Sequence, residues 1–288
     1  MKQINQFINE YIIKKKLDTP IDSSGYKYHP QTKQELINNI NELLKLNIHN
    51  FNCIDTSAIT DMSKLFSNKI IDFDDIDVSE WDVSNVENMN CMFMASYYFN
   101  CDLSNWDVSK VKDMGYIFHS CENFDCDLSK WDVSNVENMN GMFHECFKFK
   151  GKGLENWDVT NVENMGRTFC GCTRFTGKGL ENWDVSKVTD MEGMFNYCKN
   201  FNIDLSKWNV SKVKDMSYAF NYCKNFEGKG LENWNVSNVI NMTSMFTDCK
   251  KLNCDLNNWD VSSVTKMYDI FNNCTSLKNK PSWYKENI

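Results

Sequence analysis

Apolar residues return along this chain with a fixed spacing. The clearest copy of the pattern reads WDVSNVENMNGMFHEC and runs from Trp131 to Cys146. In each copy a Met stands eight residues after the Trp, and a Phe stands four residues after that Met. The Trp positions, 25 or 26 residues apart, are Trp81, Trp106, Trp131, Trp157, Trp183, Trp208, Trp234 and Trp259. A repeat of this length predicts a solenoid, in which each coil buries its apolar side chains against its neighbours.

The start of each coil has the alternation that is typical of a strand. Trp131 and Val133 are apolar, and Asp132 between them is polar. Because successive side chains of a strand point to opposite faces, this spacing predicts a short strand with Trp and Val facing inward. The coils are alike, so we expect these strands to lie side by side in a parallel ladder.

The second half of each coil has a helical spacing. Met142, Phe143 and Cys146 follow Met139 by three, four and seven residues, which places all four side chains on one face of a helix. We expect a short helix here, capped by the Asp or Asn that precedes the first Met in most coils. The predicted fold class is therefore an α/β repeat, a leucine-rich-repeat-like solenoid with short parallel strands and short helices.

Two segments outside the repeats are expected to cover the ends of the solenoid. Residues 3–16 and the segment after Thr32 carry apolar stripes with helical spacing, and Thr32 and Glu35 have the sequence of a capping box. The predicted organisation is an N-terminal helical cap over residues 1–50, a solenoid of one degenerate and eight full repeats over residues 51–275, and a C-terminal cap over residues 276–288.

The net charge narrows the range of partners. The 288-residue chain carries a formal charge of −8, whereas nucleic-acid-binding surfaces concentrate Lys and Arg, so we expect no nucleic-acid partner. No apolar run reaches the roughly 18 residues that a membrane helix needs, and we expect no membrane insertion. The first residues read as an amphipathic pattern rather than a signal peptide. We therefore expect a cytoplasmic protein, with the cell surface as the alternative.

Cysteines fill one position of the repeat. Seven of the thirteen Cys stand three residues after the Phe: Cys121, Cys146, Cys172, Cys198, Cys223, Cys249 and Cys274. We expect them to pack as small apolar residues, with no metal, no cofactor and no catalytic residue. The alternative is a zinc-like cluster in three consecutive coils. Its members would be His119, His144 and Cys170, which directly follow the Phe, together with Cys121, Cys146 and Cys172.

A polar residue follows the Trp in every coil and forms the candidate binding site. We call the carboxylates at this position the acidic ladder: Asp82, Asp107, Asp132, Asp158, Asp184 and Asp260. Asp55 takes this position in the degenerate copy, and Asn209 and Asn235 take it in two further coils. Each Asp could bond within its own Asp-x-Ser turn. Alternatively, strands about 4.8 Å apart would gather the carboxylates into a surface for a basic or polar partner.

The repeat frame WDVSxVxxMxxMFxxC, preceded by DLS, resembles that of the BspA-like leucine-rich-repeat surface proteins, a family also found among mycoplasma lipoproteins. The resemblance covers about residues 51–275. It implies a leucine-rich-like solenoid used for protein contact or adhesion, without a catalytic site. In contrast to the surface members, we expect no signal peptide, no lipid-attachment Cys near the start and no wall anchor in this chain.

The sequence thus predicts a non-catalytic repeat scaffold that binds a protein partner. One alternative is a cell-surface adhesin exported without a recognisable signal. The other is a metal- or thiol-binding protein that uses the patch around His119, His144 and Cys170.

Overall fold

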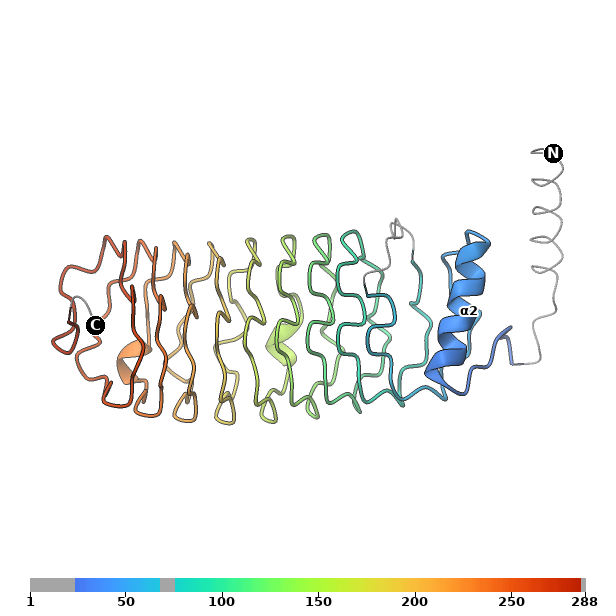
Figure 1. The fold of residues 1–288 in the computed structure, drawn as a ribbon, viewed down its shortest axis with the longest axis horizontal. Coiled ribbons are helices and arrows are strands. Elements are labelled where there is room, and N and C mark those ends of the chain that lie inside the picture. Colours follow the sequence, from blue (N-terminus) through green and yellow to red (C-terminus); the bar gives the residue numbers. More distant parts are fainter. Residues whose placement is uncertain (1–23, 68–75, 286–288) are drawn as a thin grey trace.

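The coils stack into one elongated solenoid. The computed structural model describes residues 24–67 and 76–285. Figure 1 shows the coils following one another along the long axis of the molecule, with helix α2 beside the first of them. The repeat solenoid expected from the sequence is confirmed. The helix predicted over residues 3–16 lies outside the described residues.

Helix α2 spans Lys33–Lys45 and begins at the predicted capping box. The Thr32 hydroxyl accepts a hydrogen bond from the backbone N–H of Glu35, and the Glu35 carboxylate accepts one from the backbone N–H of Thr32. The buried residues of the helix are Leu36, Ile40 and Leu43, which join the apolar core of the coils. Helix α2 therefore covers apolar surface at the N-terminal end of the described coils.

Equivalent aromatic side chains stack from coil to coil inside the solenoid. The rings of Phe118 and Phe143 are stacked with centroids 5.8 Å apart, and those of Trp131 and Trp157 with centroids 6.4 Å apart. The Trp131 indole N–H donates to the carbonyl of Leu103 in the preceding coil at 3.0 Å. Each aromatic side chain thus packs between the equivalent side chains of the neighbouring coils, and the buried indole N–H has a hydrogen-bond acceptor.

The segment from Met139 to Cys146 is not the helix that the spacing predicted. Within it, N–H groups bond three residues back, from Met142 to the Met139 carbonyl at 3.1 Å and from Cys146 to the Phe143 carbonyl at 3.0 Å. Gly141 and Glu145, third in these two turns, have φ of 59° and 61°, as type II turns require. In two consecutive four-residue turns, the buried positions recur about every four residues. This spacing is close to the 3.6-residue period of a helix, so the two structures bury the same residues.

The same segment carries the hydrogen bonds between coils. The N–H of Met139 donates to the carbonyl of Asn164 in the next coil at 2.9 Å, and that of Phe143 donates to Thr168 at 2.8 Å. Isolated parallel bridges, such as the one between Asn138 and Asn164, mark this ladder. No longer strand is present among the described residues. The segment is therefore held both by its own turns and by its neighbours.

The strand predicted around Trp131 is also wrong, although its burial pattern is right. Trp131 and Val133 are buried and Asp132 is exposed. The N–H of Ser134 donates to the Asp132 carboxylate at 3.0 Å, and that of Val136 donates to the Val133 carbonyl at 2.9 Å. Because these donors are used locally, the backbone turns here and forms no ladder with the next coil.

Short 3-10 helices occupy two of the longer links between coils. They are η1, Leu154–Asn156, and η2, Leu231–Asn233. Each follows a Gly in the left-handed region, Gly153 with φ of 95° and Gly230 with φ of 92°. These glycines let the link approach the backbone of the preceding coil closely.

The last described segment packs on the final coil. Trp283 stacks on Trp259 with centroids 6.3 Å apart, and its N–H donates to the Leu256 carbonyl at 2.7 Å. The ring of Tyr284 meets Phe271 edge-on at 5.5 Å. Trp283 therefore extends the Trp ladder by one step beyond the repeat frame.

Candidate functional site

The acidic ladder is built into the turns of the coils. The Asp107 carboxylate accepts a hydrogen bond from the backbone N–H of Ser109 at 3.0 Å, and Asp184 accepts one from Ser186 at 2.9 Å. Every other member of the ladder accepts the equivalent bond: Asp82, Asp132, Asp158 and Asp260. The bonds from Ser109 lower the pKa of Asp107, its side-chain hydroxyl contributing most. The local role of these carboxylates is confirmed, and a role in partner binding stays a prediction.

Changing Asp107, Asp132 and Asp158 together to Asn is expected to leave the free energy of unfolding within about 1 kcal/mol of the wild type. The reason is that Asn209 and Asn235 accept the equivalent bond from the Ser two residues on, each at 3.1 Å. The matched change to Ala removes the acceptor and should cost about 1 kcal/mol per site. Urea denaturation measures both variants. An Asn variant as unstable as the Ala variant would show that the turns need the charge.

The repeated Cys position faces the core. Cys146 is fully buried, and its Sγ donates to the carbonyl of Phe118 at 3.1 Å. Burial raises the pKa of this thiol well above its ordinary value. Cys121 and Cys172 make the same contact with Phe93 and Phe143. The six-residue zinc-like cluster considered from the sequence is therefore not formed, because these thiols point into the solenoid while the histidines lie at its surface.

A smaller cluster does form at this surface. The rings of His119 and His144 stack with centroids 4.5 Å apart, and the Glu145 carboxylate lies beside them, accepting a hydrogen bond from the Ser120 hydroxyl at 2.8 Å. Burial, followed by the repulsion of His119, lowers the pKa of His144 to about 4. Cys170 does not belong to this group of mutually close ligand atoms.

Sequence reasoning found both histidines and missed Glu145. On the helix that the spacing predicts, Glu145 would lie about 100° around the axis from His144. In the turns that form instead, Glu145 has a left-handed backbone and is half-buried at the surface beside His144. No sequence signal marks this residue, although Gly171, one coil later at the same position, is also left-handed.

We call the outward positions between the first Met and the Cys of each coil the variable face. Its large members include Tyr116, His119, His144, Glu145, Arg167, Tyr197, Tyr218, Tyr222 and Tyr268. Tyr197 and Tyr218 are 44% and 39% exposed. The Tyr197 and Tyr222 rings stack with centroids 4.5 Å apart, and Arg167 pairs with Glu192 at 2.6 Å.

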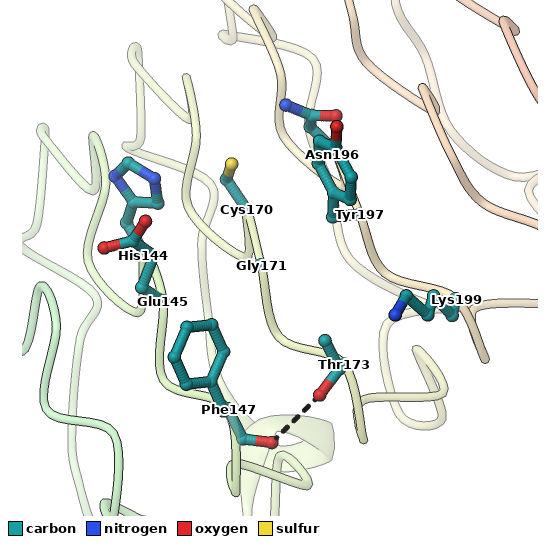
Figure 2. Close-up of a pocket in the computed structure, with 9 residues that line it drawn as sticks. All are labelled: His144, Glu145, Phe147, Cys170, Gly171, Thr173, Asn196, Tyr197 and Lys199. Carbon is teal, nitrogen blue, oxygen red and sulfur yellow. Dashed lines mark hydrogen bonds between the residues drawn. The ribbon is translucent and has the colours of Figure 1, made fainter.

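A pocket of about 340 Å³ opens on this face. Figure 2 shows that three consecutive coils line it, the first with His144 and Glu145, the next with Cys170 and Gly171, and the third with Asn196 and Tyr197. The His144 Nδ1 atom is buried and has no hydrogen-bond partner among the described residues. The pocket thus places the aromatic ring of Tyr197 beside the polar side chains of His144, Glu145 and Asn196.

These features define a repeat solenoid with a uniform interior and a variable outer face. The chain belongs to the family described as Mycoplasma protein of unknown function, DUF285, whose profile matches residues 34–153, 139–230 and 206–288. No curated protein matches it. Within the described part of the chain, no helix has the length and apolar character needed to span a membrane.

The solved structures similar to the chain include two bacterial leucine-rich proteins. A leucine rich cell surface protein from Faecalibacterium prausnitzii A2-165 is 15% identical with a TM-score of 0.34, the match covering 77% of this chain and 82% of that one. A leucine-rich repeat protein from Eubacterium ventriosum ATCC 27560 is 13% identical with a TM-score of 0.27, and that match covers 86% of this chain and 89% of the other.

Proposed function

We propose that this protein is a non-catalytic repeat scaffold that binds a protein partner through the variable face. One observation carries the proposal: equivalent outward positions on this face hold different residues in different coils, while equivalent inward positions hold the same residue or a similar one. Tyr116, Arg167 and Tyr218 share one position, and His144 and Asn196 share another. Since every coil has the same backbone, folding alone does not call for this variety.

The chemistry and rigidity of the variable face support the proposal. Tyr and Arg are the side chains that most often dominate binding energy at protein interfaces. Tyr197, Tyr218 and Arg167 stand on backbone whose N–H groups donate to the next coil at 2.8, 2.9 and 2.6 Å. A face that is held in place before binding loses little conformational entropy on contact with its partner.

The acidic ladder is the second candidate surface. Its six carboxylates are exposed, and each has one oxygen besides the Oδ1 atom that accepts the bond of its turn. Unlike the variable face, the ladder repeats almost unchanged, and the turns account for that repetition. A basic partner would still be attracted to it, mainly through a faster association rate.

The experiment compares the two surfaces directly. Partners are captured from the source cells, identified by mass spectrometry, purified, and titrated against variants. The double variant Tyr197→Asn and Tyr218→Asn should raise the dissociation constant about tenfold or more. Asn suits the left-handed backbone of both positions, where φ is 63° and 58°. The control is Tyr97→Asn with Tyr98→Asn, two exposed tyrosines outside the variable face.

Unchanged affinity of the Tyr197 and Tyr218 double variant would contradict the proposal. If the Asn triple variant at Asp107, Asp132 and Asp158 bound more weakly instead, the partner would belong to the acidic ladder.

The wider setting is also part of this proposal. We propose the BspA-like kinship indicated by the repeat frame, the division into caps and solenoid at residues 50 and 275, and a cytoplasmic location. Export as a surface adhesin is the alternative. Protease treatment of intact source cells tests the location, since a surface protein is degraded and a cytoplasmic one survives.

A further inference from the structure

Three side chains of the types that ligate metal ions meet on the variable face. His119, His144 and Glu145 each bring a possible ligand atom within 4.8 Å of the others. We propose that these three residues form a binding site for a divalent transition-metal ion of the zinc type. The site goes beyond the proposed scaffold function, because it stands whether or not the face binds a protein.

The fold of the coils creates this arrangement. His119 and His144 hold the same position in consecutive coils, so the ladder brings their rings together with centroids 4.5 Å apart. Glu145 follows His144 directly, and its φ of 61° breaks the alternation of an extended chain. Both residues are therefore half-buried at the surface, whereas Phe143 and Cys146 on either side are fully buried.

Neighbouring groups already orient two of the three ligands. The Nδ1 atom of His119 lies 3.4 Å from the carbonyl oxygen of His144, and a proton on Nδ1 donated to that oxygen leaves the lone pair of Nε2 for a metal. The hydroxyl of Ser120 holds the Glu145 carboxylate at 2.8 Å. Metal-ligating histidines usually donate their second N–H to a carbonyl or carboxylate, and ligating carboxylates are usually hydrogen-bonded in turn.

The donor set indicates the class of ion. Two imidazole nitrogens and one carboxylate oxygen suit Zn²⁺, which prefers tetrahedral coordination with bonds of about 2.0 to 2.1 Å and hence ligand atoms roughly 3.3 to 3.4 Å apart. The three ligand atoms now lie within 4.8 Å of one another, so they would approach each other further when an ion binds. The fourth position would face the pocket beside His144, where water or a partner's side chain could complete it.

The buried thiols do not compete for this ion. Cys121 and Cys146 donate to main-chain carbonyls inside the core, and a metal would have to displace those bonds and enter the packed interior. The more accessible competitors are the half-buried cysteines, such as Cys126. The test must therefore separate imidazole from thiolate ligation.

The experiment is calorimetric titration of the reduced full chain with Zn²⁺ at neutral pH. We expect one strong site per chain. Separate changes His119→Asn, His144→Asn and Glu145→Gln should each weaken it about tenfold or more, since even second-shell losses cost about 10- to 100-fold. The controls are His49→Asn, which removes a histidine outside the cluster, and Cys126→Ser, which removes an accessible thiol. Both should bind as the wild type does.

The histidine variants are designed to fold. Asn already occupies the position of His144 at Asn196 and Asn221 in later coils, so the coil accepts this side chain. Melting temperatures without metal should agree with that of the wild type, and added Zn²⁺ should raise the melting temperature of the wild type and the control variants alone.

Three results would overturn the site. The first is the lack of a stoichiometric Zn²⁺ ion on the wild-type chain. The second is binding that survives the double change of His119 and His144, which would place the ion elsewhere on the chain. The third is a Co²⁺ complex whose near-ultraviolet spectrum carries a thiolate charge-transfer band, which would assign the ion to cysteines.

Discussion

Replacing Trp131 by Ala is expected to lower the free energy of unfolding by about 3 to 5 kcal/mol, the range for large aromatic residues removed from a packed core. Trp131 is 3% exposed and stacks on Trp157 at 6.4 Å. The change also leaves the Leu103 carbonyl without the indole N–H that it accepts at 3.0 Å. Coils on both sides limit how far the cavity can collapse. The shift of the urea midpoint, with the slope of the transition, measures the loss.

Trp283→Ala is the matched control. This indole makes the equivalent bond to Leu256, at 2.7 Å, and stacks on Trp259, but it is half-buried at the end of the described stack. The loss of stability should therefore be clearly smaller than for Trp131→Ala. Equal losses, or a harmless Trp131→Ala, would contradict the account of the Trp ladder as the centre of the core.

Replacing Gly153 by Ala is expected to cost about 3 to 5 kcal/mol, as the sum of backbone strain and overpacking. Gly153 has φ of 95°, and an added Cβ atom would lie 2.2 Å from the backbone nitrogen of Ser129 in the preceding coil. That nitrogen is held by a hydrogen bond to Asp127 at 3.0 Å, so the contact cannot relax without disturbing a turn. Thermal and urea denaturation measure the change.

Gly25→Ala separates the two contributions. Gly25 has a similar φ of 89°, but nothing lies within 4 Å of its added Cβ atom. This variant should lose about 1 to 2 kcal/mol, the cost of a left-handed backbone for an L-residue. If Gly153→Ala were no more damaging than Gly25→Ala, the close approach between coils would contribute nothing to stability.

One candidate site depends on contacts within a single coil, and the other depends on contacts between coils. The Asp-x-Ser bond of Asp107 joins residues two apart, so a sequence interpretation could include it as an alternative. The cluster of His119, His144 and Glu145 forms only when neighbouring coils are in register and Glu145 has a left-handed backbone conformation. The repeat spacing by itself predicts the proximity of the two histidines alone. The hydrogen bond by which Ser120 orients the Glu145 carboxylate could not be predicted from the sequence either, because it joins residues 25 apart.

The sequence by itself determined the solenoid and its interior. A repeat of 25 or 26 residues places equivalent residues of successive coils against one another. The prediction that Trp131, Val133, Met139 and Phe143 face inward is confirmed, because apolar side chains are buried away from water. The tertiary structure alone decided the backbone. Helices and pairs of turns bury the same pattern of residues, and the bonds from Met139 to Asn164 and from Phe143 to Thr168 choose between them. Those bonds exist only when the next coil is in place, so a single repeat carries no local signal that could have revealed them.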